Sequence, residues 1–297
     1  MTKISLPRKK QFILGVGAQR TGSTWLRSQL ANCARVDLGF CKEYHFFDAL
    51  FSPQMQTYHD EPESTHASFP GIQDKIVSIR AAGKSKRLAA FVQSPDRYFN
   101  YFDNLWAKKA NVTTVGDFTP SYSMLDRKAF EYAKDELNKR GFSVKVLFIM
   151  RDPVERIWSM KHQEGRMKKI LRDVGDVEKP KISLESFTFE HAKLRTRYER
   201  TIHELEQVFD SNDIYYEFYE RYISKDRFSM LTDFVGVDSG DPDINTVRNA
   251  SYMKDKIDPA LATEVANYYK ETYQFIESRF GEEIRSLWSG YQYITYE

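Results

Sequence analysis

Residues 12–24 read FILGVGAQRTGST, and this stretch determines the expected fold. The apolar run at 12–14 predicts a buried strand, and Gly15 and Gly17 allow the chain to turn sharply after it. The next residues, 25–30, have the pattern of a helix start. A strand, a glycine-containing loop and a helix N-terminus predict an anion site, because free backbone N–H groups and the helix dipole both favour negative charge there.

The loop has nearly the spacing of a Walker A phosphate loop. Gly17 and Gly22 are separated by four residues, but Ser23 stands where that motif has the lysine that reaches the β- and γ-phosphates. The cation of this loop is Arg20 instead. The pattern therefore predicts a phosphate site that does not hold the triphosphate end of ATP with its Mg²⁺. The alternative is an ordinary strand, turn and helix in which these residue types occur by chance.

The composition is that of a folded protein without a marked charge. The 297 residues are 41% hydrophobic and carry a formal net charge of +2, which does not indicate a nucleic-acid partner. The two cysteines, Cys33 and Cys41, indicate a reducing compartment rather than a disulfide framework. Residues 1–11 lack the apolar core of a signal peptide, and no run reaches the ~18 apolar residues of a membrane span. We therefore expect a cytoplasmic protein with a single domain over 1–297, and its oligomeric state stays open.

The segment KEYHFFD, residues 42–48, places two titratable groups close together. Glu43 and His45 are two residues apart, so in an extended segment their side chains would point the same way. A carboxylate and an imidazole just beyond a phosphate loop are suited to act as a general base and its neighbour. The alternative is a solvated glutamate beside a partly buried histidine.

Two further strands are expected in the same sheet. Residues 112–118 have a strand pattern with Asp117 near the carboxyl end, which is where open parallel sheets bind ligands. Residues 144–150 form a buried strand by composition.

The motif RDPVERIWS, residues 151–159, follows that strand and predicts a second phosphate contact. Pro153 can open a helix, with Asp152 as its N-cap. Arg151 then lies at the carboxyl end of the strand, and Ser159 lies about two turns into the helix. An arginine with a hydroxyl nearby is suited to hold a phosphate, whereas a Walker B strand would end in a metal-binding acid.

The remaining segments complete an α/β pattern. We expect a short strand at 35–40, a strand at 214–218, helices at 76–110, 126–140 and 259–280, and loops at 51–75 and 236–250. Residues 161–200 hold eleven Lys and Arg against seven Asp and Glu, which indicates either a basic rim for an anionic acceptor or a pair of solvated helices. The predicted fold is α/β, a P-loop nucleotide-kinase-like parallel sheet with helices on both faces.

These stretches together resemble the sulfotransferases that use 3′-phosphoadenosine 5′-phosphosulfate (PAPS). The match is closest to the branch of the heparan sulfate and tyrosylprotein sulfotransferases and their bacterial relatives, and it covers most of the chain. The resemblance implies that the first loop holds the 5′-phosphosulfate and that the second motif holds the 3′-phosphate. The implied donor-binding residues are Arg20, Thr21, Gly22, Ser23, Thr24, Trp25, Arg151, Ser159, Asn249 and Ser251.

KEYHFFD is similar to the segment that holds the catalytic glutamate of the glycan enzymes. The resemblance implies that Glu43 takes the acceptor proton with His45 beside it, and His45 is the alternative base because the small-molecule branch uses a histidine. Asp117 is a third candidate, in a segment that resembles the acceptor side, and its place at a strand end would also suit a residue that supports the base without contacting the acceptor. Two positions depart from the family: many relatives have lysine in place of Arg20, and the glycan enzymes have lysine in place of Phe118.

The sequence thus predicts an enzyme that transfers a sulfonate group from PAPS to a hydroxyl of a glycan, lipid or small molecule. Arg20 would stabilise the leaving phosphate, and the scheme requires no metal. Two other functions remain open, a P-loop kinase-like phosphotransferase and a non-catalytic nucleotide-binding module. Ser23 and Arg151 disfavour the first, and a base candidate at Glu43 disfavours the second.

Overall fold

The computed structural model describes residues 8–52, 79–172, 183–245 and 256–295, except for the side chains of 79–85 and 163–172. Within these residues, five parallel strands form one sheet in the order β2-β3-β1-β4-β5. The strands are β1 (Gln11–Gly17), β2 (Val36–Asp37), β3 (Thr114–Phe118), β4 (Ser143–Met150) and β5 (Ile214–Phe218). The predicted α/β fold with a parallel sheet is confirmed.

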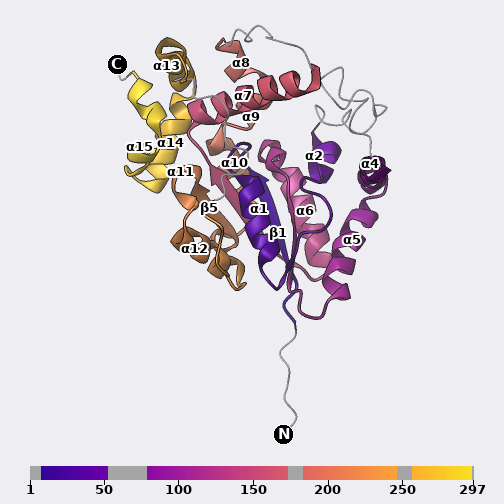
Figure 1. Ribbon diagram of the computed structural model, residues 1–297. Coiled ribbons are helices and arrows are strands. Elements are labelled where there is room, and N and C mark those ends of the chain that lie inside the picture. Colours follow the sequence, from indigo (N-terminus) through magenta and orange to yellow (C-terminus); the bar gives the residue numbers. More distant parts are fainter. Residues whose placement is uncertain (1–7, 53–78, 173–182, 246–255, 296–297) are drawn as a thin grey trace.

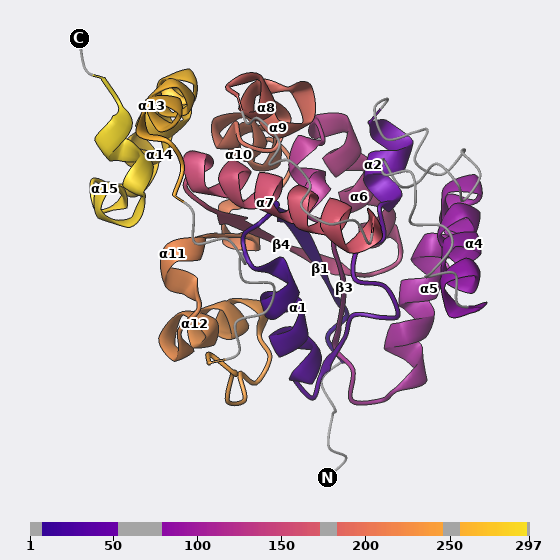
Figure 2. The ribbon, with the colours of Figure 1, turned by 45° about the horizontal axis from the view of Figure 1, so that its top comes forward.

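The sheet separates two hydrophobic cores. Phe12, Leu14 and Val16 of β1 point into one core and Ile13 points into the other, because side chains alternate along a strand. Helices α1 (Ser23–Asn32) and α12 (Lys225–Val235) cover the second core, while α5, α6, α7 and α10 pack on the first (Figure 2). Helices therefore lie on both faces of the sheet, as predicted.

The helices not yet given bounds are, in chain order, α2 (Phe46–Phe51), α4 (Ile79–Gln93), α5 (Pro95–Lys108), η1 (Pro120–Met124), α6 (Arg127–Lys139), α7 (Pro153–Arg172), α8 (Glu185–Thr188), α9 (Glu190–Leu194), α10 (Tyr198–Glu206), η2 (Ser211–Asp213), α11 (Tyr219–Tyr222), α13 (Pro259–Tyr268), α14 (Lys270–Phe280), α15 (Ile284–Leu287) and η3 (Ser289–Tyr293). Figure 1 shows their arrangement around the sheet.

Local signals placed several elements correctly. The strand predicted at 214–218 is β5, and the predicted helix at 126–140 is α6, whose N-cap Asp126 accepts a hydrogen bond from the backbone of Ala129. Helix α7 begins at Pro153, and the Asp152 carboxylate accepts from the Val154 N–H at 3.0 Å, as expected for an N-cap.

Two segments predicted to be helical each contain two helices. Residues 76–110 contain α4 and α5, because Pro95 opens a new helix after an extended Ser94. Residues 259–280 contain α13 and α14, with Tyr269 between them. The strand expected at 35–40 is only β2, and most of the loop expected at 51–75 lies outside the described residues.

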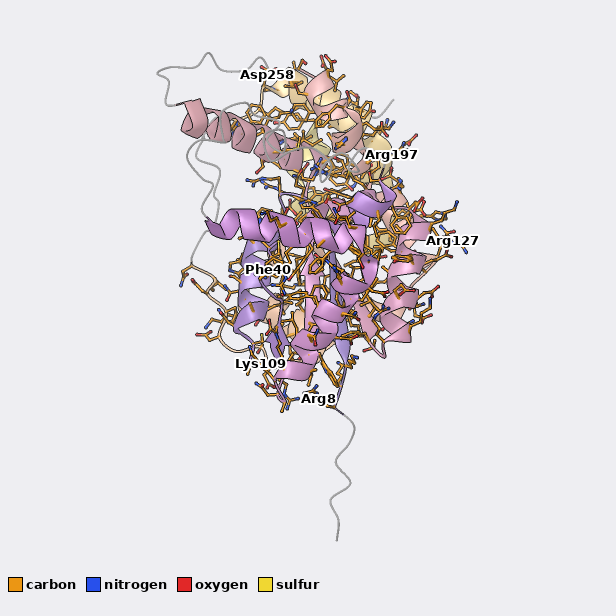
Figure 3. The ribbon with its side chains drawn as sticks, turned by 90° about the vertical axis from the view of Figure 1, so that its right-hand side faces the viewer. Arg8, Phe40, Lys109, Arg127, Arg197 and Asp258 are labelled. Carbon is orange, nitrogen blue, oxygen red and sulfur yellow. The ribbon has the colours of Figure 1, made fainter. Side chains whose placement is uncertain are left out.

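The two ends of the sheet are distinct. At the amino ends of the strands, the Arg8 guanidinium donates to the Lys109 carbonyl at 3.0 Å, and Figure 3 labels both residues at the lower end of the fold. The loops that follow β1, β3 and β4 lie at the opposite, upper end in Figure 1. The motifs singled out in the sequence are therefore gathered at one edge.

Trp288 fixes the C-terminal segment to the sheet. Its side chain is fully buried and contacts the rings of Tyr198, Phe218 and Tyr273. Its indole N–H donates to the Glu220 carboxylate at 3.1 Å. One side chain thus joins α10, β5, α11 and α14.

We expect Trp288→Ala to lower the free energy of unfolding by about 3–5 kcal/mol, because it leaves a large cavity between these elements. Urea unfolding followed by tryptophan-independent circular dichroism measures this loss. The control is Tyr268→Ala, an aromatic that is 44% exposed, which should change the stability by about 0.5 kcal/mol or less. Similar losses for the two variants would contradict the packing described for Trp288.

Candidate active site

Loops from neighbouring strands build one site at the carboxyl edge of the sheet. The backbone N–H of Thr119, after β3, donates to the Gly15 carbonyl of β1 at 3.1 Å. The N–H of Ala18, after β1, donates to the Ile149 carbonyl of β4 at 2.6 Å. Each loop is therefore held in place by the strand next to its own.

The loop after β1 turns through two residues in the left-handed region. The φ angle is 67° at Arg20 and 70° at Gly22. A Cβ at Gly22 would lie 2.5 Å from the Tyr222 hydroxyl oxygen, so space as well as backbone conformation requires glycine there. The Thr21 hydroxyl donates to the Ala18 carbonyl at 2.6 Å and closes the loop.

Helix α1 starts directly after this loop, and its first amides face outward. The N–H groups of Trp25 and Leu26 donate to the Gly22 carbonyl. In the described part of the chain, no group accepts a hydrogen bond from the N–H of Ser23 or Thr24. Such amides at a helix N-terminus are suited to hold an anion.

Arg20 and Arg151 bring the two phosphate motifs together. Arg20 Nε donates to Ser159 Oγ at 3.1 Å, and Arg151 Nη1 donates to the Arg20 carbonyl at 3.0 Å. The Arg151 guanidinium also lies 4.4 Å from the ring centre of Tyr219, and its Nε is buried without a hydrogen-bond partner. Two cations, a hydroxyl and an unsatisfied N–H thus converge beside the loop.

Trp25 is buried rather than open to the loop. Its side chain is 3% exposed and packs on the rings of Tyr222 and Phe228. Its indole N–H donates to the Asp243 carbonyl at 2.6 Å, which ties α1 to the segment before residue 246. The other expected donor contacts in that region, Asn249 and Ser251, lie outside the described residues.

Glu43, His45 and Asp48 form a chain of titratable side chains. His45 Nε2 lies 3.4 Å from Glu43 Oε2, and His45 Nδ1 lies 2.8 Å from Asp48 Oδ2. The expected extended backbone is wrong at His45, which directly precedes α2 and has a left-handed φ of 50°. The two side chains nevertheless meet, since the turn brings the imidazole back toward the glutamate.

Neighbouring charges and hydrogen bonds keep both carboxylates of this cluster, Glu43 and Asp48, ionised. Burial alone would raise the pKa of Glu43, but the hydrogen bond with His45 and the nearby Lys42 ammonium lower it to about 2. Burial would also raise the pKa of Asp48, yet the charge of His45 and hydrogen bonds from His45 and Ser121 lower it. Glu43 is the more exposed carboxylate, with 29% of its side chain accessible against none for Asp48.

Asp48 and Ser121 are site residues that the motifs did not reveal. The Ser121 hydroxyl donates to Asp48 Oδ2 and also lies 3.3 Å from His45 Nδ1. The spacing of three residues between His45 and Asp48, at the start of a helix, is the signal that would have identified Asp48. Ser121 lies in another loop, so only the tertiary fold reveals it.

Asp117 does not face the site as expected. Its carboxylate is fully buried and accepts hydrogen bonds from the hydroxyls of Tyr98, Tyr122 and Thr119 at 2.7–2.8 Å. Burial raises its pKa to about 6, although these three hydrogen bonds act in the opposite direction. Phe118, the next residue, packs in the second core against Gly15.

The family model described as the sulfotransferase domain matches residues 10–286. The chain belongs to the sulfotransferase family. A sulfotransferase from Alicyclobacillus acidocaldarius is similar over 93% of this chain and 96% of its own, with a TM-score of 0.57 and 18% identity. The sulfotransferase domain of the Synechococcus PCC 7002 olefin synthase is similar over 92% of this chain and 96% of that domain, with a TM-score of 0.50 and 18% identity.

These likenesses establish the sulfotransferase fold, and no curated protein sequence matches the chain. The family assignment supports sulfonate transfer and disfavours the kinase-like alternative. In the described residues, no helix of this sulfotransferase combines the length and apolar character needed to cross a bilayer. The same residues contain no group of three or more His, Cys, Asp and Glu side chains placed to bind a metal ion.

Arg195 is a further residue of the sulfotransferase site that the motifs did not reveal. Its Nη1 donates to the side-chain oxygen of Gln19, the residue before Arg20. Burial and the nearby Arg156 lower the pKa of Arg195 to about 10, against the opposite influence of Asp48 and Glu43. The basic excess of residues 161–200 was its only sequence signal, and that excess does not single out one cation among eleven.

The raised pKa of Asp117 predicts a pH-dependent stability. Folding makes this carboxyl hold its proton more tightly, so its stabilising contribution is complete below about pH 4 and is lost as the pH rises through about 6. We therefore compare the free energy of unfolding of the native protein with that of Asp117→Asn. The native value minus the variant value should fall by an amount on the order of 2–3 kcal/mol between pH 4 and 7.

Urea unfolding of both proteins at several pH values measures this difference. Asp241→Asn is the control, because the Asp241 side chain is 82% exposed and its replacement should give a nearly constant difference across this range. A difference for Asp117→Asn that stays constant or grows with pH would contradict the raised pKa.

Proposed function

We propose that this sulfotransferase transfers the sulfonate group of PAPS to an acceptor hydroxyl of a glycan, a lipid or a small molecule. One observation carries the proposal: a cationic, amide-lined loop and a carboxylate–imidazole–carboxylate chain lie at the same edge of the sheet. The first is formed by Arg20, Arg151 and the start of α1, and the second is formed by Glu43 with His45 and Asp48.

The residues of the loop fit an anionic donor. The unpaired N–H groups of Ser23 and Thr24 and the cation of Arg20 suit the 5′-phosphosulfate. Arg151 and Ser159 suit the 3′-phosphate, and the buried, unpartnered Nε of Arg151 is the kind of atom that a bound phosphate oxygen would satisfy. When bound, the donor supplies an electrophilic sulfur and a phosphate leaving group.

In the proposed reaction Glu43 is the general base. Its carboxylate is ionised at neutral pH and is the accessible end of the chain, whereas both nitrogens of His45 already face carboxylates. Glu43 takes the proton of the acceptor hydroxyl as the acceptor oxygen forms its bond to sulfur. Arg20 and the loop N–H groups stabilise the charge on the phosphate oxygen as its bond to sulfur breaks.

His45 and Asp48 support this base. The buried Asp48 holds Nδ1 of His45, and this contact directs Nε2 toward Glu43. The imidazole thereby positions the glutamate and balances part of its charge. His45 is the alternative proton acceptor, and a protein that binds the nucleotide without turnover is the alternative to an enzyme.

The first test concerns the donor. The protein should bind 3′-phosphoadenosine 5′-phosphate at least tenfold more tightly than AMP or ADP. Arg151→Ala should weaken the binding of 3′-phosphoadenosine 5′-phosphate at least tenfold, because a charge-assisted hydrogen bond contributes about 1.5–3 kcal/mol. Calorimetry measures both effects. Arg279→Ala, which removes an exposed arginine paired with Glu206, should leave the affinity unchanged. Equal affinity for nucleotides with and without the 3′-phosphate would contradict the donor assignment.

The second test concerns the base. Glu43→Gln keeps the shape and removes the proton acceptor, so turnover should fall by ~10²–10⁴ while the affinity for 3′-phosphoadenosine 5′-phosphate is unchanged. Turnover is measured by mass spectrometry as the gain of one sulfonate group, with the best acceptor from a library of sugars, lipids and phenols. His45→Ala is assayed beside it. An active Gln variant with an inactive Ala variant would show that His45 is the base.

A further inference from the structure

Arg195 carries a largely buried positive charge with few partners. It lies between α9 and α10, and within the described residues its only side-chain hydrogen bond goes from Nη1 to the neutral amide oxygen of Gln19 at 3.3 Å. Its Nε is buried without a hydrogen-bond partner. In the described part of the chain, no carboxylate lies within ion-pair distance of the Arg195 guanidinium, and no group accepts a hydrogen bond from its Nε or Nη2.

A second buried arginine supports it from behind. Arg156 of α7 is fully buried, and its Nη2 donates to the Ala192 carbonyl at 3.2 Å and to the Thr196 hydroxyl. These contacts hold the turn that carries Arg195. Its Nε and Nη1 have no partner, so Arg156 adds a second positive charge that no described carboxylate neutralises.

Structural arginines elsewhere in this protein are different. Arg140 forms ion pairs with Glu136 and Asp96, and Arg221 forms ion pairs with Glu217 and Glu283. Both are satisfied by two carboxylates. An arginine that is buried but not satisfied by protein groups is suited to receive an anion from outside.

The position of Arg195 relates it to the acceptor rather than to the donor. Its charge interacts with Glu43 and Asp48, the two carboxylates that face His45. Its partner Gln19, a side-chain amide, directly precedes Arg20 in the loop after β1. The phosphates of the proposed donor are already matched by Arg20 and Arg151. Arg195 thus contacts the residue before the loop cation and interacts with the charges beside the proposed base, which relates it to the acceptor of the proposed reaction.

We propose that Arg195, held by Arg156, is an anion subsite for the acceptor. This inference rests on the proposed function and narrows its substrate class: the acceptor carries a carboxylate, sulfate or phosphate group near the hydroxyl that receives the sulfonate. The Nε–Nη2 edge of a guanidinium matches two oxygens of such a group in a bidentate arrangement.

The test measures anion binding to the protein saturated with 3′-phosphoadenosine 5′-phosphate. Calorimetric titrations use 4-hydroxybenzoate and D-glucuronate, each compared with a neutral counterpart, methyl 4-hydroxybenzoate and D-glucose. At least one anion should bind saturably and at least tenfold more tightly than its neutral counterpart. Arg195→Gln should weaken that binding at least tenfold, and Arg195→Lys should weaken it less, because lysine keeps the charge and loses the planar edge.

Arg197→Gln is the matched control. Arg197 is two residues away and is labelled in Figure 3; it is 40% exposed and paired with Glu199 and Glu271, so its removal changes the net charge equally and should not alter anion binding. Absence of saturable anion binding, or equal anion binding by the native protein and Arg195→Gln, would overturn the subsite. A parallel loss of nucleotide affinity in Arg195→Gln would also overturn it, since the guanidinium would then serve the donor. Failure of the native protein to bind the nucleotide would instead contradict the proposed function.

Discussion

The site depends on the buried carboxylate of Asp117, at the carboxyl end of β3. The hydroxyls that donate to it also accept backbone hydrogen bonds: Thr119 Oγ1 accepts from the Tyr44 N–H at 3.0 Å, and the Tyr122 hydroxyl accepts from the Phe46 N–H at 3.1 Å. These two amides flank His45. One buried acid therefore fixes, through two hydroxyls, the turn on which Glu43 and His45 lie, and each link satisfies a polar group that would otherwise be costly to bury.

Asp152 has the same role at the end of β4. Its carboxylate accepts from the Tyr273 hydroxyl and from the Gly290 N–H, both at 2.5 Å, so the C-terminal segments are attached directly beside Arg151. Burial raises the pKa of Asp152, and it raises the pKa of Glu220, which accepts from the Asp152 N–H, to about 7. The acids at both strand ends thus shape loops, while the proposed base, Glu43, is more exposed than either of them.

The sequence was sufficient for features that depend on neighbours in the chain. The composition of residues 144–150 and 214–218 located β4 and β5, and Asp152 with Pro153 located the start of α7. The two motifs predicted to bind phosphate were singled out by their residue types and order, and the structure joins them through Arg20 and Arg151.

Features that depend on distant packing could not be predicted. The left-handed backbone at His45 follows from the hydrogen bonds of its turn to Thr119 and Tyr122, more than seventy positions away in the chain. Asp117 has the sequence position of a ligand-binding acid, and only its three hydroxyl partners show that it is structural. Arg195 was one cation among eleven in a basic stretch, and only its contact with Gln19, far away in the chain, relates it to the loop after β1. A carboxylate with a pKa of about 2 is a weak base, because His45 and the Lys42 ammonium stabilise its ionised form. In the proposed reaction the acceptor hydroxyl therefore gives up its proton to Glu43 only as the bond between its oxygen and sulfur forms.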